Sequence, residues 1–257
     1  MHDIAIFLGP SLHQCEAEKI LSSSVHCRIA YLPPIQRGDL TALLSGQVFY
    51  PHSDTSSPPI SPQIIGIIDG LFLETAAVGH REILSALRSG AFVIGSSSMG
   101  ALRAFELESL GMKGIGEIFH LYRSGIVESD DEVALVCDPV YYTALSEPLV
   151  HIRITLRKIR SEGLISSYEH DILFETAKKR YYPERTWDQL FEDLAHSCPY
   201  EFHLSSKGGT SAHASITMDR ITELHNLCQT HAVDQKREDA IALLTYIREN
   251  CIHETPL

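Results

Sequence analysis

The chain has 257 residues, of which 44% are hydrophobic, and a formal net charge of −12 at pH 7. This length and apolar content suit one large domain or a domain with a substantial second part. The acidic balance excludes the basic stripe that binds a phosphate backbone, so we expect no nucleic-acid partner. The longest apolar runs, such as residues 64–68, are too short to span a membrane, and no secretory leader is evident. We therefore expect a cytoplasmic protein without a membrane partner.

Apolar runs of strand length alternate with amphipathic stretches in the first half of the chain. The runs lie at residues 3–8, 27–32, 64–69 and 91–95. The stretches of helical period lie at residues 12–23, 37–44 and 79–90. Because the strand runs are continuously apolar, they indicate a parallel sheet that helices cover on both faces. Residues 51–63, which are rich in proline and serine, predict a surface loop.

From about residue 140 the pattern is helical throughout. Segments of helical period occupy residues 148–163, 167–182, 186–197, 221–231 and 233–250, with no strand candidate between them. The sequence therefore predicts an α/β fold: a three-layer parallel-sheet domain at residues 1–138, followed by an all-helical region at residues 139–257.

Metal and disulfide chemistry find little support in the sequence. The six cysteines are scattered without a C-x-x-C pair, so reduced thiols are expected and a zinc knuckle is not. His80 and Glu82 match the H-x-E of zinc deaminases, but no P-C-x-x-C follows to complete that site. The acidic run at residues 130–132 is either a divalent-cation ligand set or, more often for such a run, a solvated helix start. No metal and no cofactor are predicted.

Three consecutive serines stand between a predicted strand and the helix that follows it. One serine is enough to cap a helix N-terminus, so the excess hydroxyl needs a second explanation. The turn Ser96-Ser97-Ser98-Met99-Gly100 is close to a nucleophile elbow with serine in place of the first glycine. A cap and an elbow both remain open from the sequence.

Polar residues follow each predicted strand, at the edge where open parallel sheets bind ligands. Asp69 ends a buried strand, where an unpaired carboxylate would be costly, so a functional role is favoured. His80 is either a solvated residue at a helix start or a base. Arg103 and Glu106 are either a surface pair or two groups that face the crevice. The predicted substrate-binding residues are Gly9, Ser11, Arg37, Asp39, Ser96, Ser97, Met99, Gly100 and Glu106.

Several ordered segments resemble the TfuA-like family. They read GPSL, PPIQRGDL, IGIIDG, HREILSAL, GSSSMGALRAFEL, GMKGIGEIF, SDDEVAL and SEPLVHIRITL. The likeness spans residues 8–156 and is most specific over residues 67–106, and DQKREDAIALL resembles the family's tail. Residues 40–63 are longer than the family pattern, which makes His52 and Asp54 poor candidates for shared chemistry.

The resemblance implies a partner of YcaO-type enzymes in backbone thioamidation, of either a ribosomally made peptide or methyl-coenzyme M reductase. It further implies sulfur supply by hydrolysis of a thiocarboxylated ThiS-like carrier protein, which releases hydrosulfide for YcaO. The implied partners are therefore the YcaO-type enzyme, the ThiS-like sulfur carrier and a precursor peptide.

Such a hydrolysis is acyl-transfer chemistry, for which the residues suggest two routes. In the first, Ser98 is the nucleophile, the Met99 N–H stabilises the oxyanion, and Asp69 or His80 takes the serine proton. Arg103 would pair with the anionic thioacid. In the second route the serines only hold the anion while Asp69 activates water. A non-catalytic adaptor for YcaO and a nucleotide- or phosphate-binding enzyme are the alternative functions.

Overall fold

The computed structural model describes residues 2–22, 27–46, 61–71, 76–197 and 216–251. The chain forms two compact units, which we call the sheet unit and the helical unit. The sheet unit comprises Met1–Ala144 and Asp234–Leu257, and the helical unit comprises Leu145–Val233. The region predicted from residue 139 onward is thus divided, because its last helix belongs to the sheet unit.

Five parallel strands form one sheet in the order β2-β1-β3-β4-β5. They are β1 (His2–Phe7), β2 (Cys27–Leu32), β3 (Ile64–Ile67), β4 (Phe92–Ser96) and β5 (Lys113–Ile115). β3 is buried along its whole length, as its continuous apolar sequence predicts. The register pairs Ala5 with Ala30 on one side and with Ile65 on the other.

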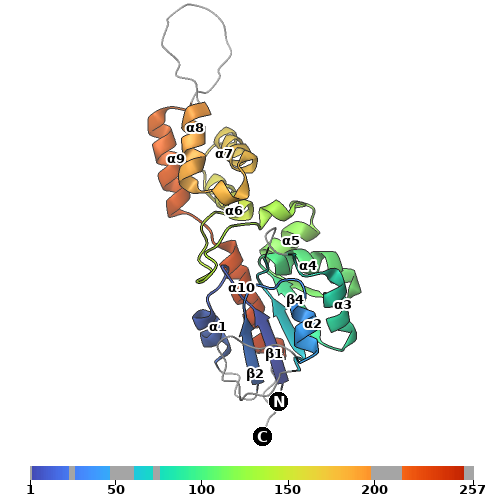
Figure 1. Cartoon of the computed structure of the whole chain (residues 1–257). Helices are drawn as coiled ribbons and strands as arrows, with labels where there is room; N and C mark the ends of the chain where they lie inside the picture. The colour runs from blue at the N-terminus through green and yellow to red at the C-terminus, as the bar shows by residue number, and fades with distance from the viewer. Residues whose placement is uncertain (1, 23–26, 47–60, 72–75, 198–215, 252–257) are drawn as a thin grey trace, which may run out of the picture. The chain divides into compact units, whose positions relative to one another are not determined.

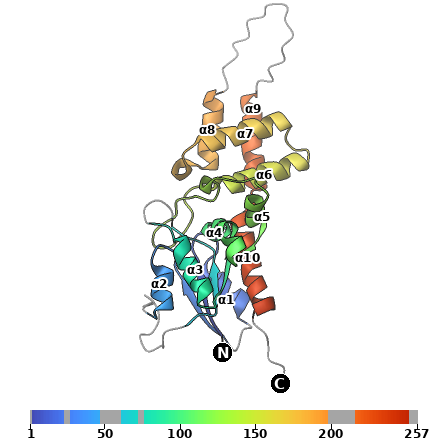
Figure 2. The ribbon, with the colours of Figure 1, turned by 90° about the vertical axis from the view of Figure 1, so that its right-hand side faces the viewer.

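Helices cover both faces of this sheet. They are α1 (Gln14–Leu21), α2 (Asp39–Leu44), α3 (His80–Arg88), α4 (Met99–Leu107), α5 (Glu117–Arg123) and α10 (Gln235–Tyr246). Figure 2 shows α1 and α10 on one side of the strands and α2 and α3 on the other. Ile4 and Ile6 of β1 pack with Leu243 and Ile247 of the C-terminal segment in one buried cluster. The prediction of a three-layer parallel α/β fold is confirmed.

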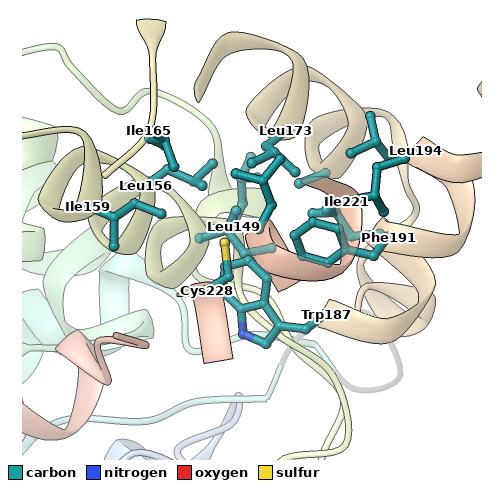
Figure 3. Packing of buried hydrophobic residues seen from close by; sticks show 14 residues of the cluster. Leu149, Leu156, Ile159, Ile165, Leu173, Trp187, Phe191, Leu194, Ile221 and Cys228 are labelled. Carbon is teal, nitrogen blue, oxygen red and sulfur yellow. The ribbon is translucent and has the colours of Figure 1, made fainter. Parts of the chain in front are cut away.

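The described part of the helical unit contains four α-helices, which are labelled in Figure 1. They are α6 (Leu149–Ser161), α7 (Ser167–Lys179), α8 (Trp187–Ser197) and α9 (Met218–Thr230). Their apolar side chains meet in one buried cluster that includes Leu156, Leu173, Trp187 and Ile221 (Figure 3). The helical character predicted for this region is confirmed.

Short irregular helices complete the described elements. The 3-10 turns are Glu108–Leu110, Asp130–Glu132 and Tyr182–Glu184, and Ile247–Cys251 is a π-helical turn that follows α10.

The strand order places a topological switch point between β1 and β3. From β1 the chain crosses to β2 on one side, and from β2 it crosses back past β1 to β3 on the other. Beyond the end of β1, Ile35 after β2 pairs with Gly70 after β3, and the Ile35 N–H donates to the Asp69 carbonyl at 2.9 Å. Open parallel sheets bind ligands at this position, outside the carboxyl ends of the two strands.

Candidate active site

Asp69 and Ser11 meet at the switch point. Asp69 follows β3, Ser11 follows β1, and the Ser11 hydroxyl donates to Asp69 Oδ1 at 2.6 Å. The Ser11 backbone N–H donates to Asp69 Oδ2 at 3.0 Å, so one residue binds both carboxylate oxygens. The Asp69 side chain is buried, with 1% of the residue exposed. A buried carboxylate with these donors is the hydrogen-bonded role that the sequence required of Asp69.

Burial raises the pKa of the Asp69 carboxyl above its usual value. The positive charge of Lys236 acts in the opposite direction, and so do the hydrogen bonds from Ser11 and from the Gly9 backbone. A carboxyl whose pKa moves toward neutrality is a better proton acceptor than an ordinary aspartate.

Gly9 lets the turn after β1 approach Asp69 closely. A Cβ at this position would lie 2.6 Å from Pro34 Cγ and 3.0 Å from Asp69 Cβ. Any side chain would therefore move the turn that carries Ser11. Gly9 is thus a positioning residue for the Ser11–Asp69 contact in this structure.

The three serines after β4 make three different sets of contacts. Ser96 donates its hydroxyl to the Asp239 carbonyl of α10 at 2.8 Å. Ser97 donates its hydroxyl to Ser11 Oγ at 2.8 Å, in a wholly buried position. Ser98 is the N-cap residue of α4, but its side chain accepts no capping hydrogen bond. Helix capping by side chains therefore does not account for the serine turn.

The Ser98 hydroxyl is buried, with 3% of the residue exposed, and has no hydrogen-bond partner among the described residues. Unsatisfied buried hydroxyls are uncommon and call for an explanation. The next residue, Met99, is the first of α4, so its N–H is one of those that a helix leaves without an internal partner. An N–H group without a partner favours a bound anion, and the positive end of the α4 dipole at the same place favours it too.

Close backbone contacts define the serine turn. A Cβ on Gly100 would lie 1.8 Å from the Ile67 carbonyl oxygen, and one on Gly95 would lie 2.0 Å from the Gly100 carbonyl oxygen. The strained residue is Ser97, with φ at 66°, whereas Ser98 has φ at −105°. The backbone feature of an elbow thus falls one residue earlier than the spacing in the sequence suggests.

Helix α10 brings two buried charged residues to this edge that sequence reasoning missed. Lys236 is 1% exposed, and its Nζ donates to the Val133 carbonyl at 3.1 Å. Asp239 accepts the N–H groups of Glu117 and Ile118 at 2.9 and 2.8 Å, where α5 begins. Burial raises the pKa of the Asp239 carboxyl, and the hydrogen bonds from α5 act against that increase. The one sequence signal was the likeness of this segment to the tail of the TfuA-like family.

His80, Arg103 and Glu106 form a second group. Glu106 Oε2 accepts from His80 Nε2 at 2.8 Å and from Arg103 Nη1 at 2.5 Å, and Arg103 Nε donates to the Val78 carbonyl at 3.1 Å. The His80 side chain is half exposed. Within the described parts of the chain, no hydrogen bond joins this group to Asp69 or to the serine turn.

Asp39 and Arg37 lie in a third set of contacts. Asp39 Oδ2 accepts the N–H of Gln36 at 2.8 Å, and the Arg37 N–H donates to the Ala76 carbonyl at 2.8 Å. Burial raises the pKa of Asp39, and the neighbouring charge of Glu82 adds to the increase. These contacts order the turn before α2.

The acidic run, two residues of the proline- and serine-rich segment and a pocket beside β5 add nothing to the predicted site. Residues 130–132 form a 3-10 turn, and no group of metal-ligating side chains is found in the described part of the chain. His52 and Asp54 lie outside the described residues. A pocket of about 480 Å³ beside β5 is lined by residues such as Lys113 and His120 and contains none of the predicted site residues.

None of the helices in the described ranges has the length and apolarity that crossing a membrane would need.

The comparisons with known proteins agree with the resemblance seen in the sequence. No curated protein matches the chain. Residues 69–186 match the model of a family described as TfuA-like protein. The match begins at Asp69 and contains the serine turn, whereas Ser11 and Lys236 lie outside it. Over residues 69–186, somewhat less than half of its length, the chain is therefore similar to the TfuA-like family.

Proposed function

We propose that this protein hydrolyses the C-terminal thiocarboxylate of a ThiS-like sulfur-carrier protein and so releases hydrosulfide for a YcaO-type enzyme. The family assignment is consistent with a role associated with YcaO thioamidation. The residues at the switch point supply chemistry that the reaction needs. The hydrolase activity and the carrier are our proposal.

The observation that carries the proposal is the buried Ser98 hydroxyl at the start of α4, which has no hydrogen-bond partner in the described part of the chain. A thiocarboxylate is an anion, and its hydrolysis passes through a tetrahedral oxyanion that needs preorganised donors. The Met99 N–H and the Ser98 hydroxyl are two donors without a partner among described residues. The helix start therefore favours binding of the thioacid group and of the oxyanion formed from it.

Two routes follow from this arrangement. In the covalent route Ser98 Oγ attacks the thiocarboxylate carbon, hydrosulfide leaves, and water hydrolyses the acyl-enzyme. In the direct route the Ser98 hydroxyl and the helix start hold the anion while a water molecule attacks. Asp69 is the base in the direct route, because hydrogen bonds through Ser11 connect this carboxylate to Ser97 in the serine turn.

Arg103 and His80 have a different role in this proposal. Glu106 neutralises part of the Arg103 charge and accepts a hydrogen bond from His80, so neither side chain is a free partner for the thioacid. His80 is half exposed and Glu106 is about one third exposed. We assign this group to contacts with the carrier's C-terminal tail rather than to proton transfer.

A non-catalytic adaptor is the second candidate, and one observation favours it. Ser11, Asp69, Ser96 and Ser97 are all buried and bonded to protein groups, as in a network that serves only the fold. In that case the protein would bind the carrier without changing it.

Hydrolysis in the absence of YcaO separates the two candidates. The purified protein is incubated with a thiocarboxylated carrier, and intact carrier mass and free sulfide are recorded. The proposal expects conversion of the thioacid to the carboxylic acid with stoichiometric sulfide. A mass adduct of carrier size that forms on the wild-type protein and disappears in Ser98→Ala would favour the covalent route. If Ser98→Ala keeps near-normal turnover while Asp69→Asn is inactive, direct attack by water is favoured. An adaptor would leave the carrier mass unchanged.

A further inference from the structure

Asp69 is held by donors from the turn after β1. The Ser11 hydroxyl and N–H donate to its two oxygens, and the Gly9 backbone N–H donates a further hydrogen bond. A base accepts a proton only from a group within hydrogen-bond reach. Of these three donors, the Ser11 hydroxyl is the one that can exchange its proton, so it is the group through which a proton can pass to Asp69.

A second hydroxyl extends this path to the serine turn. An ionised carboxylate only accepts hydrogen bonds, so Ser11 uses its single hydroxyl proton for Asp69 and its oxygen is left to accept. Ser97 donates to that oxygen at 2.8 Å. The Ser97 oxygen retains acceptor capacity of its own and belongs to the residue directly before Ser98. The two hydroxyls thus form an ordered chain that ends at Asp69.

The backbone at Ser97 is strained. Its φ of 66° lies in the left-handed region, where glycine is relaxed and serine is not. Such strain persists only where the surroundings enforce it, and it is concentrated at functional sites. At this position serine supplies the hydroxyl that glycine would lack.

We propose that Ser97 and Ser11 relay a proton from the attacking group to Asp69, which makes Asp69 the general base of the reaction. This inference rests on the proposed function. The oxygen of an attacking water molecule bonds to the thiocarboxylate carbon, and its proton passes to Ser97 Oγ. Ser97 gives its own proton to Ser11, and Ser11 gives its proton to Asp69 Oδ1.

The second half of the step returns this proton. When the tetrahedral intermediate collapses, the carbon–sulfur bond breaks, and the proton moves back from Asp69 through Ser11 and Ser97 to the sulfur. Sulfur leaves as HS⁻ and Asp69 is ionised again.

The test measures single-turnover hydrolysis of a thiocarboxylated carrier by the full-length protein and its variants. Ser11→Ala and Ser97→Gly each break the chain, and Ser89→Ala is the control because its hydroxyl donates to the Ala86 carbonyl at 2.7 Å, outside the relay. We expect each relay variant to lose about 100-fold or more in rate, as for general-base catalysis. The double variant should lose no more than the singles, because one break already stops the relay. The control should keep the wild-type rate.

A proton inventory adds a readout that a structural role would not change. The wild-type rate in mixtures of H₂O and D₂O should follow a curve, since several protons move together, and the residual rate of Ser97→Gly should lose that curvature. Should Ser11→Ala not fold, Ser97→Gly carries the test, because glycine suits the observed φ.

Two failures are distinguishable. Hydrolysis by the wild type, with both relay variants within about threefold of its rate, overturns the relay and leaves the proposed function standing. No hydrolysis by the wild-type protein overturns the proposed function and the relay with it.

Discussion

Replacing Ser97 by glycine separates the backbone strain at this position from its hydroxyl. A non-glycine residue at φ 66° costs about 1 to 2 kcal/mol, which glycine recovers. The lost hydrogen bond to Ser11 costs about 1 kcal/mol. The greater freedom of glycine in the unfolded chain costs about 0.5 to 1 kcal/mol more. The free energy of unfolding of Ser97→Gly should therefore stay within about 1 kcal/mol of the wild type.

The rate of thiocarboxylate hydrolysis should change far more in Ser97→Gly than the free energy of unfolding does. A 100-fold loss of hydrolysis corresponds to about 2.7 kcal/mol of transition-state stabilisation, well above the expected change in stability. Ser97→Ala is the companion variant, because it loses the same hydroxyl and keeps the strain. Urea denaturation and single-turnover hydrolysis of both variants give the two quantities.

Each half of this reasoning has its own refutation. If Ser97→Gly hydrolyses the carrier at the wild-type rate, the hydroxyl is not part of the reaction path. If Ser97→Gly is less stable than Ser97→Ala, the strain at φ 66° does not have the expected size.

Three further predictions concern stability. Lys236→Met leaves the buried Asp69 without its nearby cation, so the free energy of unfolding should fall by about 3 kcal/mol at pH 7. The difference from the wild type should be smaller at low pH, where Asp69 is protonated. Urea denaturation at both pH values measures the two differences. Gly100→Ala places a Cβ 1.8 Å from a β3 carbonyl oxygen and should lower the free energy of unfolding by more than about 3 kcal/mol. In the control Gly79→Ala the new Cβ lies 3.5 Å from its nearest neighbour, so its free energy of unfolding should stay within about 0.5 kcal/mol of the wild type. Equal thermal stability of the two variants would contradict this packing. A hydrogen-bonded arginine lowers the pKa of Glu169 to about 2, so this residue stabilises the folded chain above its usual pKa and loses that effect as the pH falls toward 2. Glu169→Gln should therefore cost about 1 to 2 kcal/mol near pH 7 and little near pH 2, and a cost independent of pH would refute the assignment.

The hydrophobic pattern predicted most of the fold. The run at residues 27–32 coincides with β2, and the helical stretch at residues 79–90 contains α3. β5 was not predicted, because Lys113–Ile115 is three residues long and its sequence, Lys-Gly-Ile, is not an apolar run. Placement of α10 in the sheet unit was missed too, since sequence period indicates a helix but not the surface on which it packs.

The sequence predicted which residues belong to the candidate site more readily than which of them contact one another. Position after a strand was enough to bring Ser11, Asp69 and Ser97 onto one list, and the structure joins them by hydrogen bonds. The same rule placed His80 beside them, although its hydrogen bond goes to Glu106 instead. Lys236 was missed because a lysine in a charged helical segment normally faces water, and only the fold shows its burial.

The most direct test of the central claim is the mass of a thiocarboxylated ThiS-like carrier after incubation with the purified protein alone. The account predicts that the carrier changes from thioacid to carboxylic acid, that free sulfide appears in equal amount, and that Asp69→Asn abolishes both. A carrier that binds the protein but keeps its thiocarboxylate, with no sulfide released, would contradict the account.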